Sequence, residues 1–257
     1  MRKLLLKILV CVMAVCTILC TCVACGRDED SVEEVFSEGL TYELNDAETG
    51  YTATGIGTFT GAELIFPKNY NNLPVIAIAK DSFRYLDGIK SIVIPNSVKS
   101  IGVGAFEACK GLTSVIMPDG LTNIEDWVFA SCISLTAINI PSSVTSIGGS
   151  AFHGCTALTS LVIPASVTSI GGSAFYGCSS LTNVTIGEGV VDIGVSAFDG
   201  CDSLVSVQFV NTNGWRVSQS SDMSSYTVLL SENLSKSSAD AVTYILSTYR
   251  YYYWKRY

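Results

Sequence analysis

Apolar residues recur along most of this chain with one fixed period. Six phenylalanines follow one another at intervals of 23 residues: Phe83, Phe106, Phe129, Phe152, Phe175 and Phe198. Counted from each phenylalanine, positions 6, 9 and 11 are also apolar, and so are positions 15 and 18 of the first five copies, as in Leu158, Leu161, Ile163, Val167 and Ile170. A fixed period in this range predicts a solenoid, in which each unit stacks only on its neighbours.

The alternation within one copy predicts where its strands lie. Leu161 and Ile163 are two residues apart, so both side chains point to the inward face of one strand. Pro164 then ends that strand, because proline has no N–H to donate to a ladder. Val167 and Ile170 fit a second short extended segment, and Ser-Ala-Phe-x-Gly-Cys fits one or two helical turns held by packing. The expected fold is a β-rich solenoid of 23-residue repeats with parallel strands and short helical turns.

The segments on either side of the array are expected to cap it. Residues 40–44 and 51–56 alternate like strands, which predicts an N-terminal hairpin cap leading into a degenerate first coil. Residues 237–240 carry a helix-capping pattern, which predicts a small helical C-terminal cap. The aromatic and basic tail at 249–257 is expected to cover the last coil, and a contact site for a glycan, cell wall or anionic partner is the alternative.

The N-terminus is typical of an exported protein. The chain starts with basic residues, Arg2, Lys3 and Lys7, and is nearly all apolar over residues 4–19. A basic start followed by an apolar run is the order found in secretory signals. The stretch Cys22-Val23-Ala24-Cys25-Gly26 resembles a bacterial lipoprotein box. The resemblance implies cleavage after Ala24 and lipidation of Cys25, with plain signal cleavage as the alternative. The expected location is extracytoplasmic, at the cell surface, with the lipid as the membrane anchor.

The chain therefore divides into five expected parts. They are a signal peptide (1–24), an anchor cysteine with an acidic spacer (25–38), an N-terminal cap with a degenerate first coil (39–80), the repeat array (81–210) and a C-terminal cap (211–257).

Charge and reactive residues exclude several classes of function. The formal net charge is −8, and Lys and Arg form no stripe in the repeats, which argues against nucleic-acid binding. The repeats contain no Cys-x-x-Cys pair and the chain has one histidine, His153, so no metal site or cofactor is expected. His153 is expected to face solvent, and the carboxylates are scattered over different coil positions. No catalytic residue and no enzyme activity are therefore predicted.

Five cysteines each lie three residues after a repeat phenylalanine: Cys109, Cys132, Cys155, Cys178 and Cys201. They are expected to act as small buried hydrophobes. Disulfides between neighbouring coils are the alternative, and they would leave one cysteine over.

The candidate binding residues lie between the inward positions of the first strand. At positions 8 and 10 the side chains alternate with the buried ones, so they are expected to face solvent or a partner. The candidate ligand-binding residues are Ser114, Ile116, Asn139, Ser160, Val162, Asn183, Thr185 and Gln208. The same pattern is also explained by the ordinary preference of strands for β-branched and hydroxyl residues.

The repeat resembles the BspA-like leucine-rich repeat, also called the Treponema pallidum-type repeat. The resemblance is carried by residues 155–164 and 166–175, and it extends over roughly residues 60–210. It implies a secreted or surface-anchored, non-catalytic binding protein that contributes to adhesion or other protein–protein interaction. The implied partners are proteins or glycans on a host or on neighbouring bacteria. A structural spacer or homotypic assembly protein of the cell surface is the alternative.

Overall fold

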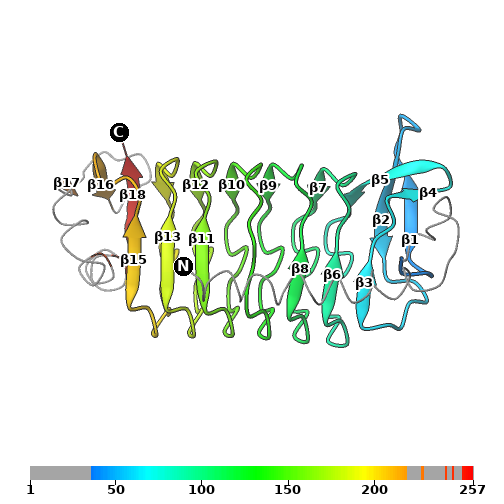
Figure 1. Cartoon of the computed structure of the whole chain (residues 1–257), viewed down its shortest axis with the longest axis horizontal. Helices are drawn as coiled ribbons and strands as arrows, with labels where there is room; N and C mark the ends of the chain where they lie inside the picture. The colour runs from blue at the N-terminus through cyan, green and yellow to red at the C-terminus, as the bar shows by residue number, and fades with distance from the viewer. Residues whose placement is uncertain (1–35, 219–226, 229–240, 242–244, 246–250, 257) are drawn as a thin grey trace, which may run out of the picture. The chain divides into compact units, whose positions relative to one another are not determined.

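The repeats wind into a row of short coils that lie side by side in chain order (Figure 1). The computed structural model describes residues 36–218, 227–228, 241, 245 and 251–256. The predicted signal peptide and Cys25 lie outside these residues. Within them, no helix has the length and apolarity needed to cross a membrane.

The first strand of each coil builds two parallel sheets. One sheet contains β3 (Glu63–Ile65), β6 (Ser91–Val93) and β8 (Ser114–Ile116), and the other contains β11 (Ser160–Ile163), β13 (Asn183–Ile186) and β15 (Ser206–Phe209). Both are parallel, and apart from β3 with β6 their strands pair residues one 23-residue repeat apart, such as Leu161 with Val184. The intervening residues 137–140 are described but form no strand, so this column of strands is interrupted there.

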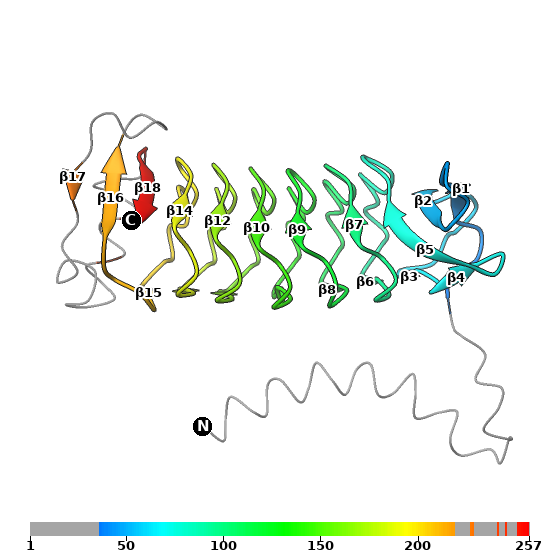
Figure 2. The same cartoon turned by 90° about the horizontal axis from the view of Figure 1, so that it is seen from above.

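The second strand of each coil builds a separate column, seen from above in Figure 2. Its parallel members are β7 (Ser100–Ile101), β9 (Asn123–Ile124), β10 (Ser146–Ile147), β12 (Ser169–Ile170) and β14 (Asp192–Ile193). β9 to β14 pair in succession, whereas β7 pairs with β5 (Leu73–Ile78) and not with β9.

The break between β7 and β9 coincides with the loss of a glycine. Gly148, Gly171 and Gly194 each follow one of these strands, and a Cβ on any of them would lie 2.4–2.6 Å from a backbone nitrogen of the preceding coil. Such an approach is closer than real Cβ atoms allow. Glu125 occupies the corresponding position after β9. We infer that its Cβ keeps β9 from pairing with β7.

The repeat phenylalanines stack on one another through the interior of the coils. Ring centroids of successive copies from Phe106 to Phe198 are 5.3–5.6 Å apart, with interplanar angles of 2–17°. Phe129 and Phe152 are fully buried. The pattern of inward residues read from the sequence is confirmed, because Leu158, Leu161 and Ile163 are all 2% exposed or less.

The segment around each phenylalanine, such as residues 150–155, is here called the Phe turn. The sequence predicted one or two helical turns for it, but in the structure it is a set of tight turns. Its amides alternate between two acceptors. His153 N donates to Ser150 O within the coil at 3.0 Å, whereas Phe152 N donates to Ala174 O in the next coil at 2.8 Å. A continuous helix cannot form, because every second amide of the turn bonds to the neighbouring coil.

The repeat cysteines add a further bond between coils. Each thiol is buried and donates to the carbonyl of the phenylalanine in the preceding coil, as Cys155 Sγ does to Phe129 O at 3.2 Å. All five are free thiols. They are thus buried as expected, and they also act as hydrogen-bond donors. Burial raises the pKa of the Cys109 thiol from 9.0 to about 11 and that of Cys155 well above 9.0.

The N-terminal cap is the predicted hairpin. β1 (Thr41–Leu44) and β2 (Tyr51–Gly55) pair antiparallel, and Asn45 Oδ1 accepts a bond from Thr49 N at 2.8 Å in the turn. β2 then pairs with β5 in parallel, and β4 (Asn69–Tyr70) forms a second hairpin with β5. Asn71 and Asn72 make its turn at φ of 46° and 67°. This small hairpin makes the degenerate first coil longer than the later ones, because β3 and β6 pair residues 28 apart, as Leu64 with Ile92.

The C-terminal cap contains strands that the sequence analysis did not predict. β16 (Trp215–Ser218) pairs with β17 (Thr227–Val228) and with β18 (Tyr253–Arg256), and β18 continues the second column by pairing antiparallel with β14. Trp215 and Trp254 are buried beside Phe209, so aromatic residues do cover the last coil. The predicted capping helix falls mostly outside the described residues.

The close approach at Gly171 predicts a sensitive site. Gly171→Ala should lower the free energy of unfolding by about 1–3 kcal/mol, because the new Cβ meets the Gly149 backbone. Gly88→Ala is the matched control, since a Cβ there has no neighbour within 4 Å. It should leave stability unchanged or raise it by about 0.4–1 kcal/mol. Chemical denaturation measures both variants, and an equal loss in the two would contradict the steric explanation.

The buried thiols predict a loss of stability in alkali. From about pH 9 to pH 10 a thiol ionises in the unfolded chain but stays neutral in the folded one, because the folded pKa of Cys109 is about 11. The unfolded state then binds fewer protons, so the free energy of unfolding falls, by up to about 1.4 kcal/mol per pH unit for each such thiol. Denaturation at pH 7, 9 and 10 tests this. Cys109→Ala should flatten the slope, and an unchanged slope would show that this thiol is not responsible.

Candidate binding surfaces

The strand face, formed by the outward residues of β6, β8, β11, β13 and β15, has the predicted alternation. In β11 the side chains of Ser160 and Val162 are exposed, whereas Leu161 and Ile163 are buried. Val162 is 64% exposed and Ile116 of β8 is 42% exposed. A strand that buries every second residue leaves the others for solvent or for a partner.

Strand register brings most of the predicted residues together. Val162 lies beside Thr185, which lies beside Gln208, and Ser160 lies beside Asn183. Ser114 and Ile116 belong to the other sheet, where they pair with Ser91 and Val93. Asn139 is exposed but lies in the interruption between the two sheets. The eight residues are therefore divided into two groups with Asn139 between them.

Hydroxyl groups beside the strand face are already engaged within the fold. Thr159 Oγ1 donates to Thr136 O at 3.4 Å and Thr182 Oγ1 donates to Thr159 O at 2.9 Å. On the second column Thr145 and Thr168 bond in the same way to the coil before. The outward residues of β11 and β13 are themselves uncharged: Ser160, Val162, Asn183 and Thr185.

A second surface, here called the aromatic ladder, lies on the Phe turns. It consists of Trp127, His153 and Tyr176. The His153 ring is 5.8 Å from that of Trp127 and 5.0 Å from that of Tyr176, between centroids. Trp127 is 44% exposed and Tyr176 is 39% exposed. His153 is half-buried between them, so it faces solvent less than the sequence analysis expected.

The repeat pattern does not reveal this ladder, because its three rings do not occupy the same repeat position. His153 and Tyr176 both follow a repeat phenylalanine, but Trp127 comes two residues before one. Ala130 occupies the position that would hold the third ring, and Trp127 supplies that ring from elsewhere in the turn. The available signal was the size of Trp127, because the matching residues in other copies are Asp, Gly or Ser.

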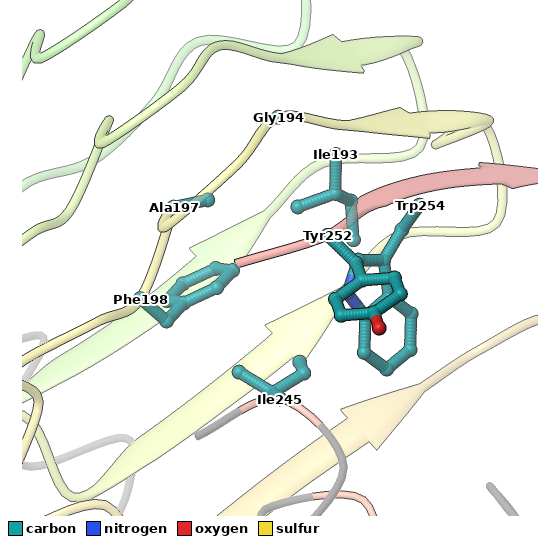
Figure 3. Close-up of a pocket in the computed structure, with 7 residues that line it drawn as sticks. All are labelled: Ile193, Gly194, Ala197, Phe198, Ile245, Tyr252 and Trp254. Atoms are coloured by element: carbon teal, nitrogen blue, oxygen red, sulfur yellow. The ribbon is translucent and has the colours of Figure 1, made fainter. Parts of the chain in front are cut away.

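The described residues offer little for small-molecule chemistry. They contain no group of three or more His, Cys, Asp or Glu side chains placed to hold a metal. A small gap with room for about one water molecule, open to solvent, lies between the last coil and the C-terminal cap (Figure 3). The side chains around it are apolar apart from the Tyr252 hydroxyl and the Trp254 indole N–H. Ligand pockets usually hold roughly 300–1,000 Å³ with several converging polar groups, so this one is a packing gap.

Solved structures share the fold. A leucine-rich repeat protein of T. pallidum is 31% identical, with a TM-score of 0.63 over 68% of this chain and 82% of that one. A leucine-rich repeat protein from Bacteroides ovatus is 28% identical, with a TM-score of 0.61 over 68% of this chain and 46% of that one. A leucine rich cell surface protein from Faecalibacterium prausnitzii is 26% identical, with a TM-score of 0.51 over 68% and 39%.

This chain therefore spans less than half the length of the last two proteins. No curated protein matches it. A family model described as the BspA type leucine rich repeat region matches residues 76–216 in six copies. Because this match covers more than half of the 257-residue chain, the protein belongs to the BspA-type leucine-rich repeat family.

Proposed function

We propose that this protein is an exported, surface-anchored binding module that recognises a protein or glycan through its strand face and carries out no catalysis. The observation that supports this most directly is the 64% exposure of Val162 on β11, a strand that pairs with β13 on one side and borders the interruption at residues 137–140 on the other. Leucine-rich repeat proteins generally bind other proteins, which favours a protein partner.

The strand face suits recognition by shape more than by charge. Val162, Thr185 and Gln208 lie in a row across three paired strands, with Ser160 and Asn183 in the row beside them. Their short side chains lose little conformational entropy when a partner immobilises them. An aliphatic centre with a polar border is also the usual composition of a binding interface.

The anchoring part of the proposal comes from the leader. A lipid on Cys25 would attach the chain to the membrane, and the acidic run that follows would hold the array away from the surface. Proteins of this repeat family are typically surface-exposed in bacteria, which agrees with such a location.

The strand face can be tested by placing a negative charge at its apolar centre, Val162. The chain is screened against immobilised matrix proteins, mucin glycans and bacterial surfaces, and Val162→Glu is then compared with the parent on each ligand found. We expect binding to weaken about tenfold or more, because a buried unpaired carboxylate is costly in an interface. Val191→Glu is the control, because Val191 is also exposed but precedes β14 on the second column.

Equal weakening by both variants would place the interface elsewhere. Concentration-dependent oligomers in light scattering, together with no heterologous binding in the screen, would instead favour the homotypic assembly role.

Lipidation is tested separately by metabolic labelling with a radioactive or clickable palmitate in a bacterial host. The parent chain should incorporate label, Cys25→Ala should abolish it, and Cys22→Ala should retain it, because only Cys25 directly follows the expected cleavage site. Label that survives Cys25→Ala would place the lipid on another residue, whereas a parent chain that is processed without label would favour plain secretion.

A further inference from the structure

Trp127 has a backbone conformation that its side chain does not favour. Its φ is 61°, in the left-handed region where bulky residues are rare. The equivalent residues of the other copies share this conformation and are small or short: Asp81, Gly104, Ser150, Ser173 and Ser196, with φ between 55° and 63°. The fold therefore requires the conformation at this position but does not require a tryptophan.

Packing does not explain the tryptophan either. Trp127 is 44% exposed, and the stack of repeat phenylalanines beneath it is complete without it. A strained backbone at an exposed aromatic residue points to a role outside folding. Trp127 also completes the aromatic ladder, since its ring covers one face of His153 while Tyr176 covers the other.

The same row of the array already contains a guanidinium bound to an aromatic ring. Arg84 lies over the Tyr85 ring, 4.5 Å from its centroid. Its two terminal nitrogens pair with Asp81 at 3.1 Å and Glu107 at 2.6 Å. The Phe turn around Phe83, together with Glu107 of the next turn, thus holds one cation between aromatic and carboxylate groups.

The coils that carry the ladder have aromatic rings and carboxylates but no cation of their own. Between Lys110 and Arg216 the sequence contains no Lys or Arg. It contains seven acidic residues there: Asp119, Glu125, Asp126, Glu188, Asp192, Asp199 and Asp202. Glu125 and the exposed Asp126 directly precede Trp127. Electron-rich ring faces beside carboxylates attract ammonium and guanidinium groups.

We propose that the aromatic ladder is a second binding site, which takes the Lys or Arg side chains of a basic polypeptide partner. The cation lies over the outer ring face of Trp127 or of Tyr176, the faces directed away from His153. The exposed Asp126, whose Oδ1 also accepts a bond from Gly149 N at 2.6 Å, adds negative charge next to Trp127 in the chain. The inner faces stack on His153, so the ladder offers no continuous platform for sugar rings. This site does not include the strand face and does not rest on the function proposed for it.

Tryptophan fluorescence of the full chain tests the proposal directly. Trp127 is exposed, whereas Trp215 and Trp254 are 1% and 3% exposed, so a ligand at the ladder acts mainly on Trp127. The probes are an arginine-rich peptide, a glutamate-rich peptide of equal length and a neutral oligosaccharide. We expect the arginine-rich peptide alone to change the emission, and its binding to weaken as salt is raised.

Trp127→Ser, read by calorimetry, should weaken binding of the arginine-rich peptide by about fivefold to thirtyfold. Serine is the residue of the next three coils at this position, so the variant should fold with an unchanged or higher melting temperature. Tyr251→Ser is the control, because it removes an exposed aromatic residue of the C-terminal cap and should leave binding unchanged. Two results would overturn the proposal: binding that survives Trp127→Ser, or an oligosaccharide that binds in place of the peptide.

Discussion

The bonding of each repeat phenylalanine to the coils beside it is the constraint on which the array depends. Its ring stacks on the rings of both neighbouring copies, at 5.6 Å and 5.3 Å for Phe152. Its amide donates to the next coil, and its carbonyl accepts the cysteine thiol of that coil, as Phe152 O does from Cys178 Sγ at 3.3 Å. Phe152 O also accepts a bond from Cys155 N at 3.2 Å, so the thiol of the next coil supplies a second bond to the same buried carbonyl. The cysteine therefore adds a bond between coils that an alanine of similar size could not make.

The Phe turns continue where both columns of strands are interrupted. At the break between β7 and β9, Phe106 N still donates to Val128 O at 3.0 Å. At the interruption over residues 137–140, Phe129 N donates to Ala151 O at 2.8 Å. We infer that the turns set the spacing of the coils and that the short strands follow where local residues permit. The exact period of 23 residues is then a consequence of keeping every phenylalanine in the stack.

The sequence was sufficient to predict the array because inward positions repeat. Leu161, Ile163 and their equivalents serve one purpose in every copy, so periodicity reveals them. Other features depend on single copies. The pairing of Ile193 with Trp254 joins residues far apart in the chain with no shared pattern, and the break at β9 depends on one glycine replaced by Glu125. The turn geometry was mispredicted because bonds to a neighbouring coil cannot be distinguished from helical bonds in a short apolar segment.

The difference between residues that repeat in every copy and residues found in a single copy also separates the scaffold from the candidate sites. Residues shared by all copies are buried or bonded within the array, whereas Val162 and Trp127 are exposed residues at positions where the copies differ. The strand face was predicted from alternation alone. The aromatic ladder was not, because Trp127 reaches it from a different position in the turn. Exposed residues that the fold does not require, such as Trp127, mark candidate sites of this kind.

Native-state amide hydrogen exchange tests the central role of the Phe turns most directly. If the turns hold the array together, the amides of Phe106 and Phe129, beside the two interruptions, should be as strongly protected as those of Phe152 and Phe175. If instead the strands hold the coils, Phe106 and Phe129 would exchange much faster than the amides of the paired strands β11 and β13, and the account would be contradicted.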